Sequence, residues 1–414
     1  MINSLSTPQS ITGLLQDTPL ARFESTYSEM LAEQGYAIGT QRQYLGSLLH
    51  FGRWMAANGL LEEDLNGVLI VRFVDEHLPI CACPGRNYRK TNTVRAALRK
   101  LYSIEEVAVI FKVEVQIDAV ARELDKFDAF LRDLRGLADN TRLQRRRIIG
   151  LLLDQARDPR GGIYPLNTTM LRDFIATTLE RWSPASAAVM TGALRAYLRY
   201  RAYCGDDVST LMPVIVSPAC WRLASLPETL SSEEVERVLG SFGPPLPSWR
   251  RGVAIAQCVA RLGLRASEVV GLELEDLNWN DGTIRIRRSK SHRIDLLPML
   301  PPVGAAIVDY LHNERPACVS RQVFVRHVAP VEKPIQKRVV ASVLNAAYQR
   351  CDLPYTRVHI FRHSLATRVL DAGGTLKEVA DVLRHRSLDT TQIYAKLDER
   401  RLSAVAMPWP GSLS

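Results

Sequence analysis

The sequence contains no long apolar run. No uninterrupted apolar stretch approaches the roughly 18 residues that a membrane-spanning helix needs, and no basic leader with an apolar segment opens the chain. We therefore expect a soluble protein of the cytoplasm that has no membrane partner.

Cysteine is scarce and shows no regular spacing. The seven cysteines are an odd number at scattered positions, which favours reduced thiols in the cytosol over a disulfide framework. His77, Cys81 and Cys83 lie close together in the sequence, but two thiols one residue apart chelate one ion poorly. We expect these three residues to be structural.

Metal and nucleotide motifs are also missing. His359 and His363 have the i, i+4 spacing of a zinc-binding helix, yet Ile360 stands where a metallopeptidase needs glutamate, and no third ligand follows. A P-loop is absent. The expectation is a protein that uses neither a metal nor another cofactor.

Acidic residues are outnumbered by basic ones. There are 53 Lys and Arg against 44 Asp and Glu, which gives a net charge of +9 and a pI near 9.3. Such an excess favours a polyanionic partner, although a basic solvated surface is the alternative. The 414 residues are enough for more than one domain.

The first half repeats loosely. Gly35, Ala37, Thr40, Phe73 and Val74 recur 101 positions later, and a basic amphipathic helix follows the Gly-to-Thr turn in both copies. Two all-helical modules are predicted, with a generic pair of helical bundles as the alternative. The recurring residues are Gly136, Ala138, Thr141, Phe174 and Ile175.

The second half changes to mixed structure after a proline-bearing linker. Residues 281–299 alternate in period two around a polar turn, which predicts a β-hairpin entered at Asp281-Gly282. A capping box at Ser231 and Glu234 begins the first helix of this half. Further helices are expected at 302–313, 337–350, 361–371, 375–384 and 388–399, capped at Thr375 and Ser387. The fold class is thus mainly α with a small β-hairpin, an α+β domain preceded by helical modules.

Residues suited to phosphate chemistry lie in this half. An arginine precedes a helix in "GLRASEVVGL", a lysine occupies the hairpin tip, and a histidine and an arginine stand three apart in "HIFRHSLATRVL". "LRHRSLDTTQIY" adds a histidine and a tyrosine. Taken singly each is more often a solvated or packing residue. The set in chain order is Arg265, Lys290, His359, Arg362, His385 and Tyr394.

The order and spacing of this set resemble the tyrosine recombinase family, which includes phage integrases and Xer-type resolvases. The resemblance covers about residues 226–400, and all six catalytic positions are filled. It implies a site-specific recombinase, of integrase or transposase type and from a mobile element, that cuts and rejoins DNA through a 3′-phosphotyrosyl intermediate and a Holliday junction. It further implies the domains 1–115 (arm or core-binding-like), 116–222 (core-binding, SAM-like) and 223–414 (catalytic).

Residue roles follow from the same resemblance. Tyr394 is the nucleophile, Lys290 the general acid for the 5′-oxygen, and His359 assists proton transfer from the tyrosine, while the remaining members hold the phosphate. Glu268 orients the neighbouring arginine. One departure stands out, because Arg384 occupies the place of the glycine usual before the second histidine, where φ is often positive.

The expected partners are double-stranded recombination sites, a homotetramer on two synapsed sites, and accessory DNA-bending or co-recombinase proteins. Residues after Tyr394 are expected to dock on a neighbouring subunit. Two other functions remain open: a type IB topoisomerase that relaxes DNA, and a non-catalytic DNA-binding protein on the same fold. DNA contacts are expected from Thr141, Arg142, Arg145 and Arg146.

Overall fold

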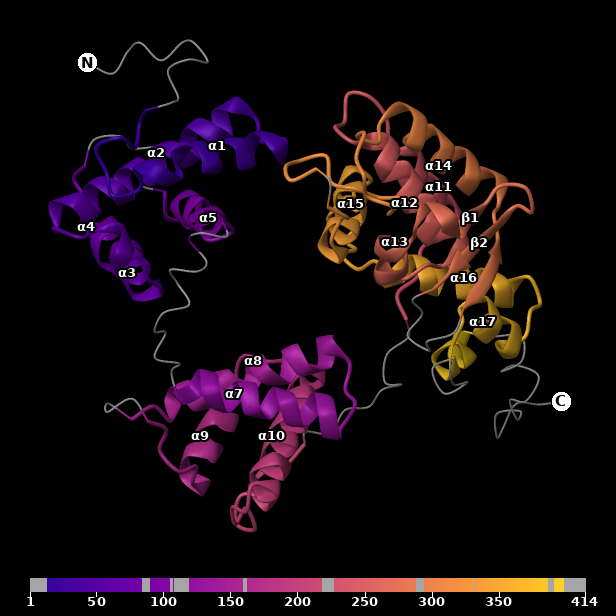
Figure 1. Ribbon diagram of the computed structural model, residues 1–414. Coiled ribbons are helices and arrows are strands. Elements are labelled where there is room, and N and C mark those ends of the chain that lie inside the picture. The colour runs from indigo at the N-terminus through magenta and orange to yellow at the C-terminus, as the bar shows by residue number, and fades with distance from the viewer. Residues whose placement is uncertain are drawn as a thin grey trace. The chain divides into compact units, whose positions relative to one another are not determined.

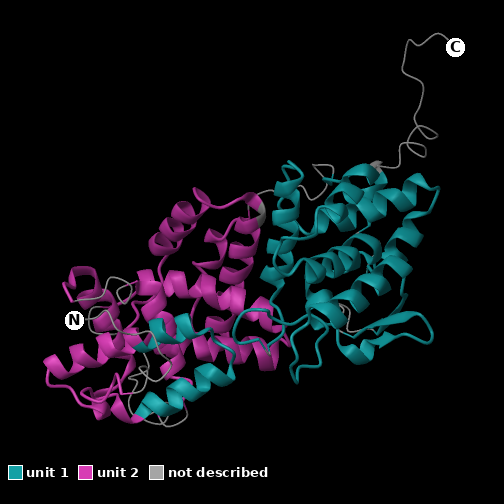
Figure 2. Ribbon diagram, turned by 90° about the horizontal axis from the view of Figure 1, so that it is seen from above, with its two compact units in different colours: residues 1–12, 23–45, 223–414 teal, residues 13–22, 46–222 magenta. Residues whose placement is uncertain are grey.

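The computed structural model describes residues 13–83, 90–104, 107, 119–158, 162–217, 227–287, 294–331, 333–385 and 391–397. No helix within these ranges is long and apolar enough to cross a membrane. The chain divides into two compact units, one of residues 1–12, 23–45 and 223–414 and the other of residues 13–22 and 46–222 (Figure 2). The three-domain division expected from the sequence stays a prediction.

The N-terminal residues form helices only. Helix α5 shows why, because its apolar residues recur at three- and four-residue spacing and all four of them are buried. The elements are η2 (Ala21–Phe23), α1 (Glu24–Glu33), α2 (Ile38–Ala57), η3 (Glu62–Asp64), α3 (Gly67–Val71), η4 (Arg72–His77), α4 (Leu78–Ile80) and α5 (Thr91–Leu101) (Figure 1).

A second helical group follows and has its own core. Asn167 and Ser183 cap two of its helices by accepting backbone N–H groups. Buried Phe127, Ile149 and Leu194 belong to one hydrophobic cluster that joins these helices. The elements are α7 (Ala119–Ala129), η6 (Phe130–Leu134), α8 (Asp139–Gln155), α9 (Thr168–Leu179), α10 (Pro184–Tyr203) and η7 (Met212–Val214).

The loose repeat has a structural counterpart. Gly35 and Gly136 both end a helix with positive φ, +72° and +56°, a conformation that glycine adopts without strain. The N–H groups of Thr40 and Thr141 each donate to the carbonyl three residues earlier, at 2.8 and 2.9 Å. The repeated phenylalanines are both buried. The matched residues therefore build the same helix-turn-helix start at both places.

The C-terminal residues build a mainly helical body around a small antiparallel sheet of order β1-β2-β3. Helix α12 is almost entirely apolar on its buried face and contacts α14, α15 and α16. The elements are α11 (Ser232–Gly240), α12 (Trp249–Leu262), α13 (Ala266–Gly271), η8 (Leu274–Asp276), β1 (Leu277–Asn278), β2 (Thr283–Ile286), β3 (Asp295–Pro298), α14 (Pro301–Asn313), α15 (Lys337–Arg350), α16 (His359–Asp371), α17 (Leu376–Val382) and η10 (Gln392–Leu397).

The predicted hairpin is present. β2 pairs with β3 from Thr283 opposite Pro298 to Ile286 opposite Asp295, and Gly282 turns the chain into β2 with φ +60°. The chain between these strands includes 288–293, so Lys290 lies outside the described residues.

Most predicted helices are found within two residues of their expected ends. The segment 337–350 is confirmed as α15, and the capping boxes at Ser231 and Thr375 are formed. The helix expected over 375–384 ends at Val382, and η10 is a 3₁₀ helix within the expected 388–399. Ser387 and residues 398–414, with the expected docking tail, lie outside the described residues.

Candidate active site

Arg265 begins the site at the N-terminus of α13. Its backbone N–H donates to Glu268 Oε2 at 2.9 Å, and its Nη1 donates to Glu268 Oε1 at 2.7 Å. The carboxylate of Glu268 is completely buried, and the arginine side chain is 20% exposed. One glutamate thus closes the helix end and fixes the guanidinium, the orienting role expected for it.

Arg362 is the most deeply buried arginine of the site. It lies one turn into α16 and donates to the carbonyl oxygens of Gly263 and Leu383. Burial, with repulsion from Arg265 and Arg384, lowers its pKa to about 9. The backbone thus aims the guanidinium, and the neighbouring cations make an anion favourable beside it.

Arg384 keeps the turn in which the family usually has glycine. Its φ is +53°, so the left-handed conformation is retained at the cost that a Cβ imposes. The side chain is only 4% exposed, and its Nη2 donates to Glu268 Oε2 at 2.8 Å. A buried ion pair therefore accompanies the strained backbone.

The site carries more positive than negative charge. The guanidinium groups of Arg265, Arg362 and Arg384 gather around one carboxylate, Glu268, which leaves the cluster cationic. Burial and the same arginines lower the pKa of His385 to about 4. A neutral histidine beside uncompensated cations suits a bound anion.

Tyr394 combines packing with a polar contact. Its ring is 2% exposed and belongs to the cluster of Ala366, Leu370, Val379 and Leu383. Its hydroxyl lies 2.8 Å from Nδ1 of His363. Burial raises the tyrosine pKa to about 12, against the opposing effect of the nearby arginines. The phenol is therefore protonated at neutral pH.

The structure brings most of the predicted set together. Arg265, Arg362, His385 and Tyr394 influence one another electrostatically, and the His385 ring stacks parallel to Tyr394 with centroids 6.4 Å apart. His359 is exposed at the first position of α16. Lys290 cannot be placed, since it lies outside the described residues.

Sequence reasoning passed over His363. It was weighed only as half of a zinc pair, yet it is the residue whose ring nitrogen meets the Tyr394 hydroxyl. Burial, His359 and Arg362 lower the His363 pKa to about 4, so the neutral ring can accept the tyrosine proton in a hydrogen bond. Its position directly after Arg362 was the available signal.

Comparison with known proteins agrees with this geometry. Residues 228–401 match the model of the phage integrase family. The chain is 33% identical over 400 residues to the integrase/recombinase y4rA of Sinorhizobium fredii, with 95% of each chain covered. This chain belongs to the phage integrase family of tyrosine recombinases. It is therefore an enzyme that cleaves and rejoins DNA.

Two further matches support the recombinase assignment. The tyrosine recombinase XerD of Lacticaseibacillus casei is 29% identical over 277 residues, which cover 66% of this chain and 92% of that protein. The fold is shared with the XerH site-specific recombinase, whose crystal structure is a post-cleavage complex with its palindromic difH substrate. That match has a TM-score of 0.52 and 17% identity, and it covers 70% of this recombinase and 97% of XerH.

The arginines expected to contact DNA differ in their surroundings on α8. Arg142 is 14% exposed and forms ion pairs with Asp128 and Asp139, at 3.4 and 2.9 Å. Arg146 pairs with Asp125 at 2.6 Å. For Arg145, burial and the positive charges of neighbouring arginines lower the pKa. Thr141 caps the start of the same helix through its backbone.

Proposed function

We propose that this protein is a site-specific recombinase that exchanges DNA strands through a 3′-phosphotyrosyl intermediate on Tyr394 and a Holliday junction. One observation supports this most directly: three guanidinium groups and a buried tyrosine hydroxyl converge around a single carboxylate. Phosphodiester cleavage needs such charge to stabilise the non-bridging oxygens as the transition state forms.

In the cleavage step the Tyr394 oxygen attacks the scissile phosphorus while the bond from phosphorus to the 5′-oxygen breaks. The phenolic proton passes to a histidine, and Lys290 supplies a proton to the departing 5′-oxygen. Arg265 and Arg362 hold the non-bridging oxygens, and His385 donates to one of them. Rejoining reverses these transfers with a new 5′-hydroxyl, so no external energy source is needed.

The contact between Tyr394 and His363 bears on the proton's route. The resemblance assigns the assisting role to His359, yet the neutral ring within 2.8 Å of the phenol is that of His363. We assign His363 the role of positioning residue, which holds the hydroxyl until a phosphate occupies the cationic cluster. His359, exposed at the start of the same helix, stays the expected partner of the phosphate-bound state.

DNA binding by α8 is assigned mainly to Arg145. The three arginines at 142, 145 and 146 were equivalent in the sequence, but two of them are paired with aspartates. Repulsion between Arg145 and its neighbours Arg135 and Arg199 is relieved by a phosphate. Thr141, at the helix start, keeps its proposed role beside the same backbone.

The assembly and the biological setting are also proposals. XerH and XerD act in the same family, and the XerH structure contains a DNA recombination site. We infer double-stranded recombination sites as substrates, a homotetramer on two synapsed sites, accessory DNA-bending or co-recombinase proteins, and a mobile element as the source. The enzyme would then act at the nucleoid, where its DNA is.

A two-site plasmid tests this function. DNA flanking the gene is searched for inverted repeats, and two copies of a candidate repeat are placed in one supercoiled plasmid. Recombination predicts deletion or inversion products and branched intermediates that depend on both copies. Relaxation without exchange would indicate a type IB topoisomerase, and binding without any strand cleavage would indicate a non-catalytic protein.

A further inference from the structure

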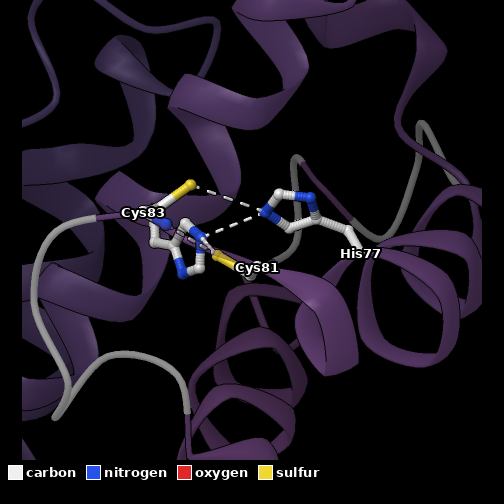
Figure 3. A group of neighbouring side chains, drawn as sticks. His77, Cys81 and Cys83 are labelled. Atoms are coloured by element: carbon white, nitrogen blue, oxygen red, sulfur yellow. Dashed lines mark hydrogen bonds between the residues drawn. The ribbon is translucent and has the colours of Figure 1, made fainter.

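Four metal-binding side chains meet in the N-terminal helical region, far along the chain from the catalytic residues. His50 lies on α2, His77 ends η4, and Cys81 and Cys83 follow α4. Their ligand atoms all lie within 4.8 Å of one another, and among the residues that the structure describes no other group of three or more meets this condition. Figure 3 shows His77 and both cysteines turned toward a common point.

The spacing of the donor atoms fits one tetrahedral ion. The two Nε2 atoms of His50 and His77 are 3.3 Å apart. Cys81 Sγ lies 3.2 Å from His50 Nε2, and Cys83 Sγ lies 3.8 Å from His77 Nε2. Zinc bonds of about 2.0–2.1 Å to nitrogen and about 2.3 Å to sulfur place tetrahedral ligands about 3.3–3.8 Å apart. The observed separations cover the same interval.

The surroundings also suit a thiolate-bound metal. The backbone N–H of Cys83 donates to Cys81 Sγ at 3.3 Å, the kind of contact that stabilises a ligating sulfur. The His50 ring meets Phe73 edge-on at 5.1 Å, and the His77 ring stacks on Phe73 at 5.3 Å. His50 is 8% exposed. Aromatic packing therefore fixes both imidazoles on one side of the cluster.

We propose that His50, His77, Cys81 and Cys83 bind one Zn²⁺ as a closed, structural Cys₂His₂ site. Two nitrogens and two sulfurs at tetrahedral spacing select zinc among common cellular metals, and four protein ligands leave no position open for chemistry. The sequence pattern did not favour this site, because the fourth ligand stands 27 residues before His77 and joins only through folding.

The ion would join the end of η4 and the loop after α4 to α2. These segments are short: α3 has five residues, η4 six and α4 three, so they have little intrinsic helical stability. Metal binding supplies folding free energy to such segments and releases protons as the thiols ionise. Zinc loss is therefore expected to loosen this region while the catalytic residues keep their fold.

Metal analysis of the purified full-length protein tests the site. We expect about one zinc per chain after gel filtration in a reducing buffer without added metal. The variants Cys81→Ser and Cys83→Ser should lose it, whereas Cys204→Ser, which changes an exposed cysteine outside the cluster, should keep it. Replacement of zinc by Co²⁺ should give the intense visible bands of a tetrahedral cobalt–thiolate site, which are absent from the two cluster variants.

A ligand exchange separates metal binding from simple misfolding. His77→Cys retains a zinc ligand and should keep the metal, whereas His77→Phe preserves ring packing against Phe73 but should lose it. Undiminished zinc in the Cys81→Ser and Cys83→Ser variants, or no zinc and no cobalt spectrum in the folded wild type, would overturn the proposal. Strand cleavage plays no part in either readout.

Discussion

At the scale of single residues, Tyr394 serves two purposes from one position. Its ring fills the small core between α16, α17 and η10, while its hydroxyl faces His363. A helical tyrosine taken alone is usually a packing residue, and this one does pack. Its chemical role follows from the arginines nearby, which no local sequence window contains.

Arg384 gives a first prediction at this scale. Arg384→Gly relieves the positive φ, worth about 1–2 kcal/mol, but removes a buried ion-pair partner, a loss that costs about 3–5 kcal/mol when uncompensated. Because Glu268 keeps Arg265, we expect a net destabilisation of about 1–3 kcal/mol. Urea-dependent pulse proteolysis of the catalytic region measures it.

Asp352→Gly is the matched control. Asp352 has nearly the same φ, +52°, but is exposed. This change should leave stability unchanged or raise it slightly. If Arg384→Gly were also neutral or stabilising, the ion pair with Glu268 would contribute nothing to the fold.

The histidines give a prediction about pH. The pKa values of His363 and His385 fall from 6.5 to about 4 in the folded protein. The unfolded chain therefore binds more protons between these values, so the stabilisation is complete above pH 6.5 and is lost as the pH falls toward 4. Histidine-selective NMR should show both rings neutral at pH 5.5.

Phosphate binding reverses this shift. An anion beside the arginines favours the charged imidazole, so bound substrate DNA should raise the pKa of His385. Resonances are assigned by His363→Asn and His385→Asn, with His312→Asn as a surface control. A His385 resonance that titrates near pH 6.5 without DNA would contradict the cationic cluster.

At the scale of elements, local patterns and tertiary contacts divide the work of prediction. Helix α15 was predicted at both ends because its periodicity and its boundaries are local. Residues 392–397 were expected to be α-helical, but they form a 3₁₀ helix around Tyr394. The order of the catalytic residues was legible in the sequence. Which histidine meets the tyrosine was not, since two turns of α16 and η10 must first come together.

Helix α8 gives the prediction for DNA binding. Arg145→Ala should weaken DNA affinity and reduce the slope of log K against log salt by about 0.9 for each lost phosphate contact. Arg142→Ala should change the slope less, because its guanidinium is already paired with aspartates. Fluorescence anisotropy over a salt series compares them, and equal slopes for the two variants would contradict the assignment.

At the scale of the whole molecule, a chain of net charge +9 concentrates cations where an anion is needed. The catalytic cluster lies in one compact unit, and the proposed zinc ligands and α8 lie in the other. Family membership could be inferred from the sequence because six residues keep their order over about 130 positions. The zinc ligands could not, because no spacing rule joins His50 to a pair of cysteines on a later loop.

The most direct test of the central claim is covalent trapping on nicked suicide DNA that carries the recombination site. Wild-type protein should become attached through a 3′-phosphotyrosyl bond, and peptide mass spectrometry should locate the nucleotide on Tyr394. Tyr394→Phe should bind the same DNA and form no covalent complex. Persistent attachment in that variant, or a nucleotide on another residue, would contradict Tyr394 as the nucleophile.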